Sequence, residues 1–354
     1  MSDSSNEMIT VLEYPGGISA IDSGMVRDQM AACYLLETGS AVAVIETGNA
    51  ASADRIMKVL RFRGRQPEEV SHVIVTHVHL DHAGGAGRLL GKLPQAVLAV
   101  HPRGARHMID PSKLEASARA VYGDERYEAM YGALVPVPEE RVRIMEDGDF
   151  LHVGHRKLEF MDSPGHARHH FTVWDEETSG WFTGDTFGLS YRELDTSKGP
   201  FIFPTTTPIQ FDPGALADSV DRMMERAPEN MYLTHFGRLD RPQGMADTLR
   251  EGIRGMADLA LREENTDTGD RMARLRAAVG DWPTGPRLAA LANGSGSGHD
   301  QGFPAGAQII DYEYSSLLVD LIDRLCDLQG IDRPRHGGDG DLLLEVEVRL
   351  QSDR

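Results

Sequence analysis

Three histidines and an aspartate lie within six residues of one another, in the order His77, His79, Asp81 and His82. Imidazole nitrogens and carboxylate oxygens are ligands that zinc and iron accept in proteins. In an extended segment His77 and His79 point the same way, because side chains alternate with a period of two. These two rings can therefore bind one ion together. We expect the chain then to turn into a helix that places Asp81 and His82 beside a second ion.

The residues around this motif predict a loop between a strand and a helix. A short apolar run from Val70 to Val75 precedes it and predicts a buried strand. Gly84 and Gly85 follow it, where they relieve crowding at a bend, and residues 84–92 are predicted to begin a helix. A run of surface histidines is the alternative interpretation, and the buried-type strand before the motif disfavours it.

Short apolar runs and turn residues predict the elements that position the motif. Helical periodicity also covers most of residues 103–133, which we interpret as an inserted helical lid or packing element. The two halves of the chain, 8–100 and 141–235, each combine strands with helices, so a sandwich of two sheets covered by helices is expected. The predicted strands are 8–13, 32–46, 96–100, 142–145, 157–162, 170–174, 180–183 and 230–234, and the predicted helices are 51–64 and 212–227.

The character of the chain changes after about residue 240. Helices are predicted at 243–264, 266–279 and 308–329, separated by a Gly-, Ser- and Pro-rich linker at 285–306, with a strand at 342–346. We therefore divide the chain into a catalytic domain, 1–240, and a C-terminal helical extension, 241–354, that packs on it.

Composition and net charge limit the classes of protein to which the chain can belong. The chain has 354 residues, of which 40% are hydrophobic, and a formal net charge of −19. Such a charge repels phosphate backbones, so nucleic acid is not an expected partner. No apolar stretch approaches the ~20 residues that span a bilayer, which argues against a membrane partner, and the polar start lacks the features of a secretion signal. We expect a cytoplasmic protein that acts on a small molecule, with homo-oligomer formation left open.

The histidine motif resembles the His-x-His-x-Asp-His signature of the metallo-β-lactamase superfamily. Three later segments are similar to the other ligand segments of that family: Pro164-Gly165-His166, Gly184-Asp185-Thr186 and Thr234-His235-Phe236. The resemblance covers about residues 30–240. It implies an α/β fold of the αββα sandwich type, the metallo-β-lactamase fold, here with a helical insert and a C-terminal helical extension.

The same resemblance implies a ligand set and a mechanism. It assigns His77, His79 and His166 to a first ion, Asp81, His82 and His235 to a second, and Asp185 to both. Two divalent metal ions, expected to be Zn²⁺ with iron or manganese as alternatives, lower the pKa of a shared water. The hydroxide attacks a carbonyl carbon, and Asp81 orients this nucleophile and passes its proton toward the leaving group.

Departures from particular relatives narrow the function. β-Lactamases of this fold usually carry Cys where Asp185 stands and lack the His82 ligand, and flavo-diiron proteins usually carry Glu where His79 stands. The chain is more similar to glyoxalase II and to the acyl-homoserine lactonases. A small ester, thioester or lactone is therefore the expected substrate. A mononuclear or di-iron oxidoreductase (persulfide dioxygenase-like), a phosphodiesterase and a non-catalytic binding protein stay open as alternatives.

Candidates outside the ligand set are fewer. Tyr191 lies six residues after Asp185, and a tyrosine shortly after the bridging aspartate assists carbonyl binding in some lactonases. Tyr191 is therefore a candidate catalytic residue, with ordinary packing as the alternative. His169 or His170 is a candidate partner of a ligand. The loop 189–211 and the insert 103–133 are candidates for shaping the substrate pocket.

Overall fold

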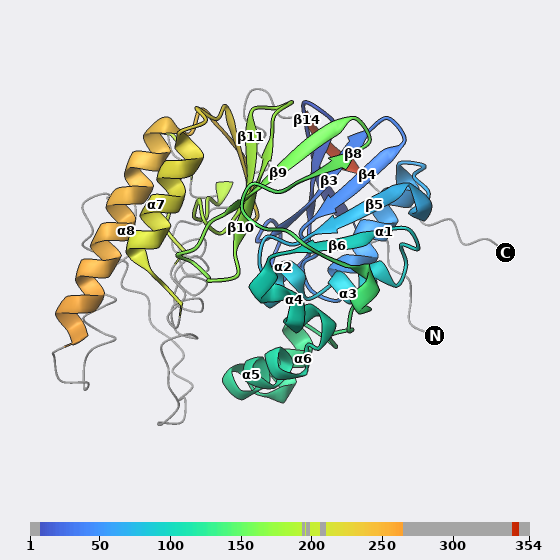
Figure 1. Ribbon diagram of the computed structural model, residues 1–354, viewed down its shortest axis with the longest axis horizontal. Helices are drawn as coiled ribbons and strands as arrows, with labels where there is room; N and C mark the ends of the chain where they lie inside the picture. The colour runs from blue at the N-terminus through green and yellow to red at the C-terminus, as the bar shows by residue number, and fades with distance from the viewer. Residues whose placement is uncertain (1–7, 193–194, 196–198, 206–209, 265–341, 347–354) are drawn as a thin grey trace.

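A computed structural model describes residues 8–192, 195, 199–205, 210–264 and 342–346. Its strands form two sheets that lie face to face (Figure 1). The first sheet has the order β14-β1-β2-β3-β4-β5-β6-β7, and the second has the order β13-β12-β11-β10-β9-β8. Helices cover the outer face of each sheet, so the αββα sandwich expected from the sequence is confirmed.

The strands of the first sheet are β1 (Ile9–Tyr14), β2 (Ile18–Asp22), β3 (Ala32–Thr38), β4 (Ala41–Ile45), β5 (Val70–Ile74), β6 (Val97–Val100), β7 (Val142–Ile144) and β14 (Leu342–Val346). Those of the second are β8 (Phe150–Val153), β9 (Arg156–Asp162), β10 (Phe171–Asp175), β11 (Gly180–Gly184), β12 (Asn230–Leu233) and β13 (Gly237–Asp240). The helices are α1 (Ser52–Phe62), α2 (Leu80–Ala83), α3 (Ala86–Leu90), α4 (Pro102–Ile109), α5 (Ser112–Tyr122), α6 (Asp124–Met130), α7 (Pro213–Met224) and α8 (Gln243–Glu264).

Alternation along the strands divides the core into layers. In β4, Val42 and Val44 pack against the outer helices, while Ala43 and Ile45 face the other sheet. Both faces of the strand are buried, which explains why its sequence is one continuous apolar run. On the far side of the second sheet, Trp181 packs with residues of α7 and α8.

Parallel pairing brings several strand ends to one edge of the sandwich. β4, β5, β6 and β7 pair in parallel, and so do β11 and β12. The segments that follow β4, β5 and β6 therefore leave the first sheet at the same edge, where ligands commonly bind in open α/β sheets. The segments that follow β11 and β12 leave the second sheet in the same way.

The structure differs from the sequence prediction mainly in short elements. β2, β8 and β13 were not predicted. The helix expected over 84–92 is the shorter α3, and a separate short helix, α2, precedes it within the motif itself. Gly84 and Gly85 lie between α2 and α3, where the chain passes close to another segment. A Cβ atom at Gly85 would lie 2.5 Å from the carbonyl oxygens of Thr47 and Asn49. Side chains larger than glycine do not fit where the motif loop crosses the β4–α1 connection.

The region after residue 240 is described only in part. The helix at 243–264 is confirmed as α8, which packs on α7, and the strand at 342–346 is confirmed as β14, which pairs antiparallel with β1. The helices expected at 266–279 and 308–329 and the linker at 285–306 lie outside the described residues. The division at residue 240 therefore stays a prediction. Within the described residues, no helix combines the length and apolar character needed to cross a bilayer.

Candidate metal centre

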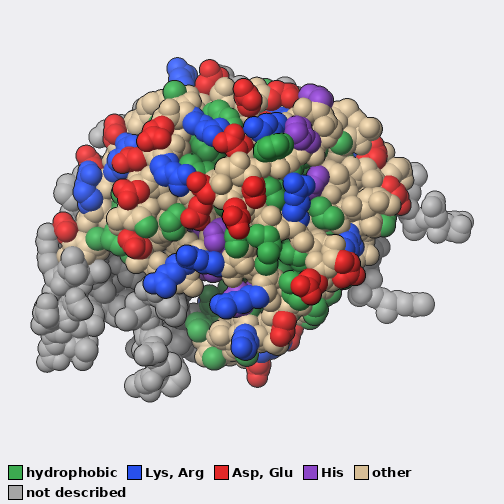
Figure 2. All heavy atoms as spheres, in the orientation of Figure 1, with side chains coloured by type: hydrophobic (Ala, Val, Ile, Leu, Met, Phe, Trp, Pro, Cys, Tyr) green, Lys and Arg blue, Asp and Glu red, His purple; other side chains and the backbone are tan. Residues whose placement is uncertain are grey.

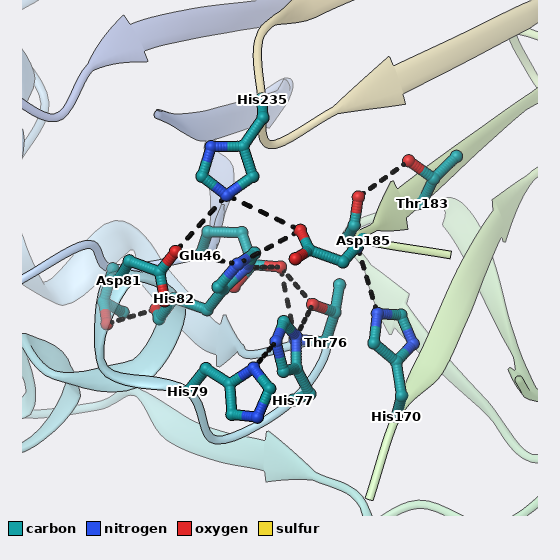
Figure 3. Close-up of polar contacts among 12 residues, drawn as sticks. Glu46, Thr76, His77, His79, Asp81, His82, His170, Thr183, Asp185 and His235 are labelled. Atoms are coloured by element: carbon teal, nitrogen blue, oxygen red, sulfur yellow. Dashed lines mark hydrogen bonds and ion pairs between the residues drawn. The ribbon is translucent and has the colours of Figure 1, made fainter. Parts of the chain in front are cut away.

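Seven side chains predicted as ligands gather at the edge where the two sheets meet (Figure 3). His77, His79, Asp81 and His82 come from the loop after β5 and from α2. The remaining three come from the second sheet, because His166 lies between β9 and β10, Asp185 follows β11 and His235 follows β12. Segments separated by more than 100 residues in the sequence therefore supply one site.

The first group consists of His77, His79 and His166. The Nε2 atom of His77 lies 2.9 Å from Nδ1 of His79, and Nε2 of His166 lies 3.1 Å from the same Nδ1. Ligand nitrogens about 2.0–2.1 Å from a tetrahedral zinc ion are roughly 3.3 Å apart. The three nitrogens therefore already lie near the spacing that such an ion requires.

The second group consists of Asp81, His82 and His235. The Oδ2 atom of Asp81 lies 3.3 Å from Nε2 of His235 and 3.5 Å from Nε2 of His82. All of its ligand atoms lie within 4.8 Å of one another. Like the first group, it combines side chains from both sheets.

Asp185 lies between the two groups and offers one carboxylate oxygen to each. Its Oδ2 is 3.3 Å from Nε2 of His166 in the first group. Its Oδ1 is 3.2 Å from Nε2 of His82 and 3.6 Å from Nε2 of His235 in the second group. This is the geometry of a carboxylate that can bridge two ions.

Two buried atoms test whether the centre suits metal ions. Within the described part of the chain, Asp185 Oδ1 and His82 Nε2 make no hydrogen bond, although both are inaccessible to solvent. Polar atoms buried in this way are costly unless a partner compensates them. A divalent cation bound to both atoms would supply that partner in the second group, and the three imidazoles of the first group suit another ion.

The pKa shifts of the side chains in the centre also favour bound cations. Burial lowers the pKa of the His82 imidazole, but Asp81 and Asp185 more than offset this and raise it well above its ordinary value. Burial would raise the pKa of Asp185, yet nearby imidazoles, led by His82, lower it well below its usual range. Burial lowers the pKa of His166 to about 3, which leaves that ring neutral and its lone pair available to a metal. Asp81 and Asp185 thus create a negative potential at His82, which favours a cation there.

Glu46 is a candidate site residue that the sequence analysis missed. It directly follows β4, its backbone has a φ of 65°, and its side chain is buried. Its Oε1 accepts a hydrogen bond from the Thr76 hydroxyl and lies 3.5 Å from Nδ1 of His82. A carboxylate behind a metal-binding imidazole fixes the orientation of the ring. A positive φ is uncommon at residues other than glycine, and the exceptions cluster at functional sites.

Hydrogen bonds also hold the ligands of the second sheet. His170 accepts a bond from the Asp185 amide through Nε2 at 3.1 Å, and its Nδ1 is 2.9 Å from the Ser163 hydroxyl. The structure thus distinguishes His170, which supports the bridging carboxylate, from His169, whose Nδ1 accepts from the Val78 amide at 3.5 Å.

Tyr191 is buried beside the second group. Its ring centroid lies 6.3 Å from that of His235, and the guanidinium carbon of Arg27 lies 4.6 Å from the centroid of the tyrosine ring. The predicted site residue is therefore near the centre.

The two segments expected to shape a pocket also border the centre. In the loop 189–211, Leu189 pairs with Phe203, and the Thr205 hydroxyl donates to the Asp185 carbonyl at 2.8 Å. The insert contributes Tyr131, which packs with Leu80 of α2. Both segments are thus attached to ligand-bearing elements.

Comparison with known proteins identifies the architecture. A sequence profile described as the metallo-beta-lactamase superfamily matches residues 26–235. The chain belongs to the metallo-β-lactamase superfamily. The match covers more than half of the chain and contains every residue of the candidate centre, so the family expected from the sequence motifs is confirmed.

Individual metallo-β-lactamase-fold relatives are distant. A metallo-beta-lactamase fold-containing protein of Sulfurisphaera tokodaii is 28% identical over 188 residues, covering 52% of this chain and 67% of the relative. An N-acyl homoserine lactonase of Bacillus thuringiensis is 25% identical over 251 residues, covering 64% of this chain and 88% of the lactonase. A solved superfamily structure from Sulfolobus tokodaii aligns with a TM-score of 0.54 at 23% identity, over 74% of this chain and 94% of that one, which supports the fold alone.

Proposed function

We propose that the chain is a dinuclear metal-dependent hydrolase that cleaves a small ester, thioester or lactone. The observation that carries this proposal is Asp185, whose two oxygens face the two ligand groups at 3.3 and 3.2 Å. When bound, two divalent ions make hydroxide available near neutral pH and polarise a carbonyl oxygen. Zinc is the proposed metal, since imidazole and carboxylate ligands suit it, and N-acyl homoserine lactonases among the relatives support an acyl substrate.

Asp81 is the proposed proton carrier. Its Oδ2 faces His82 and His235, while its side chain is 24% exposed, against 8% for Asp185. Asp81 therefore belongs to the centre and is also partly accessible to solvent. From that position its carboxylate can orient the nucleophile, accept its proton and deliver this proton to the leaving oxygen or sulfur.

Tyr191 is the proposed donor to the carbonyl oxygen of the substrate. Replacing it with phenylalanine removes the hydroxyl and retains the ring that packs near His235. We expect Tyr191→Phe to lower kcat about tenfold, the value of one hydrogen bond gained in the transition state, with unchanged metal content. Steady-state kinetics with metal analysis measures this. A wild-type kcat would leave Tyr191 a packing residue.

Metal content measured together with an activity panel tests the proposed function. We expect two divalent ions per chain and hydrolysis within a panel of thioesters, esters, lactones and phosphodiesters. Chelation should abolish that activity, and added Zn²⁺ should restore it. One redox-active iron per chain with no acyl hydrolysis would instead indicate an oxidoreductase, and hydrolysis confined to the phosphodiesters would indicate a phosphodiesterase.

A further inference from the structure

Three exposed arginines border the first ligand group, and the proposed chemistry does not use them. Arg103 and Arg106 lie on α4, and Arg168 lies between His166 and His169. Together they form what we call the arginine rim. Figure 2 shows Lys and Arg side chains gathered beside a hollow next to the α4–α6 part of the molecule.

Hydrogen bonds connect the rim to the ligand loop. The Arg103 guanidinium donates through Nη1 to the carbonyl oxygen of Arg168 at 3.3 Å. On the same helix, Arg106 donates through Nε to Nε2 of His107 at 3.2 Å. The neighbouring His169 packs edge-on against the ligand His79, with ring centroids 5.4 Å apart. Arg168 of the rim is therefore the immediate sequence neighbour of a ring that packs on the ligand His79.

The described residues contain no carboxylate that pairs with the rim. Among the described residues, no carboxylate oxygen lies within 4.0 Å of the three guanidinium groups. Other surface arginines are paired, for example Arg222 with Asp147 at 2.8 Å and Arg250 with Asp221 at 2.5 Å. In the described part of the chain, the rim thus keeps cations without a carboxylate partner beside the centre, although the net charge of the whole chain is −19.

Asp162 is the carboxylate at the base of α4, and it is already engaged. Its Oδ1 lies 3.0 Å from Nε2 of His101, whose Nδ1 accepts from the Arg103 amide and caps the helix. This pairing fixes the start of α4 and leaves the guanidinium groups of the rim available to an external oxyanion.

We propose that the arginine rim binds a carboxylate or phosphate group of the substrate, on the part of the molecule remote from the scissile bond. This inference rests on the proposed function and narrows its substrate class to anionic acyl compounds. The planar fork of arginine matches an oxyanion with two parallel hydrogen bonds. The electric field of the rim also favours anionic substrates over neutral ones, although the net negative charge of the whole chain repels anions.

Matched thioesters test the rim during turnover. Succinyl and butyryl thioesters of the same neutral thiol have acyl chains of equal length, and only the first carries a carboxylate. We expect the double variant Arg103→Gln/Arg168→Gln to raise KM for the succinyl thioester about tenfold, the loss of a charge-assisted bond. Its kcat, its metal content and its KM for the butyryl thioester should stay within about twofold of wild type.

A control and a binding measurement complete the test. Arg143→Gln removes an exposed arginine of β7 whose Nη2 donates to the Phe150 carbonyl, and it should change neither KM. Calorimetric titration of the metal-loaded protein with succinamate and butyramide needs no turnover, and only the first of these two amides carries a carboxylate. A tenfold loss of succinamate affinity in the double variant, with butyramide unchanged, supports the rim even if neither thioester is hydrolysed, which would count against the proposed function alone. Equal succinamate affinities in the variant and the wild type, or equal losses for both ligands, would overturn the rim.

Discussion

Replacing Asp185 with asparagine is expected to lower kcat/KM by about a thousandfold and to leave one ion per chain instead of two. The carboxylate faces His166 with one oxygen and His82 with the other. Asparagine has nearly the same size but offers one neutral oxygen, so one ligand group loses its anionic member. Because the proposed nucleophile is shared by two ions, losing one of them removes most of the rate.

Elemental analysis and kinetics on the same preparation measure both effects. Asp221→Asn provides the matched control, because this aspartate is exposed on α7 and pairs with Arg250 instead of a ligand. The control should keep two ions and wild-type turnover. Full activity with two ions bound in Asp185→Asn would show that Asp185 does not bridge the centre.

Glu46→Gln is expected to weaken binding of the second ion about 10- to 100-fold, the usual effect of losing the partner of a metal-binding imidazole. The Glu46 carboxylate lies 3.5 Å from Nδ1 of His82, and we expect it to orient that ring when a metal ion is bound. Glutamine keeps the length of the side chain and can still accept from Thr76, so the change isolates the charge. Competition with a chromophoric chelator gives the affinity of each ion.

A carboxylate elsewhere separates this effect from general loss of charge. Glu37→Gln removes a carboxylate of β3 that pairs with Arg63 and Arg65. It should lower stability slightly and leave both metal affinities unchanged. If Glu46→Gln bound both ions as tightly as the wild type, the role assigned to Glu46 would be refuted.

The sequence predicted the local part of the centre better than the distant part. His77 to His82 are nearly contiguous, and the preceding buried strand determines where they point, so spacing alone indicated a metal site. His166, Asp185 and His235 were placed only through resemblance to a family. No local rule brings the ends of β5, β11 and β12 together, because that depends on how two sheets pack.

Glu46 and the arginine rim could not be predicted from the sequence, because their contacts also depend on how distant segments pack. Glu46 is separated from His82 by 36 positions, and a glutamate after a strand is an ordinary feature until parallel pairing of β4 with β5 places it behind the motif. Arg103 and Arg168 meet only in the folded chain. β2 was missed because it is a five-residue strand directly after a glycine turn, where length and periodicity give little signal.

Each ligand group takes side chains from both sheets, so a bound ion is a reversible cross-link between the two layers of the sandwich. An ion that binds the native state and not the unfolded chain adds its binding free energy to folding, about 2.7 kcal/mol for each site at a hundredfold excess over Kd. The contact between the layers then depends on the supply of metal in the surroundings as well as on the apolar core between them. We expect metal scarcity to lower the amount of folded protein as well as its turnover.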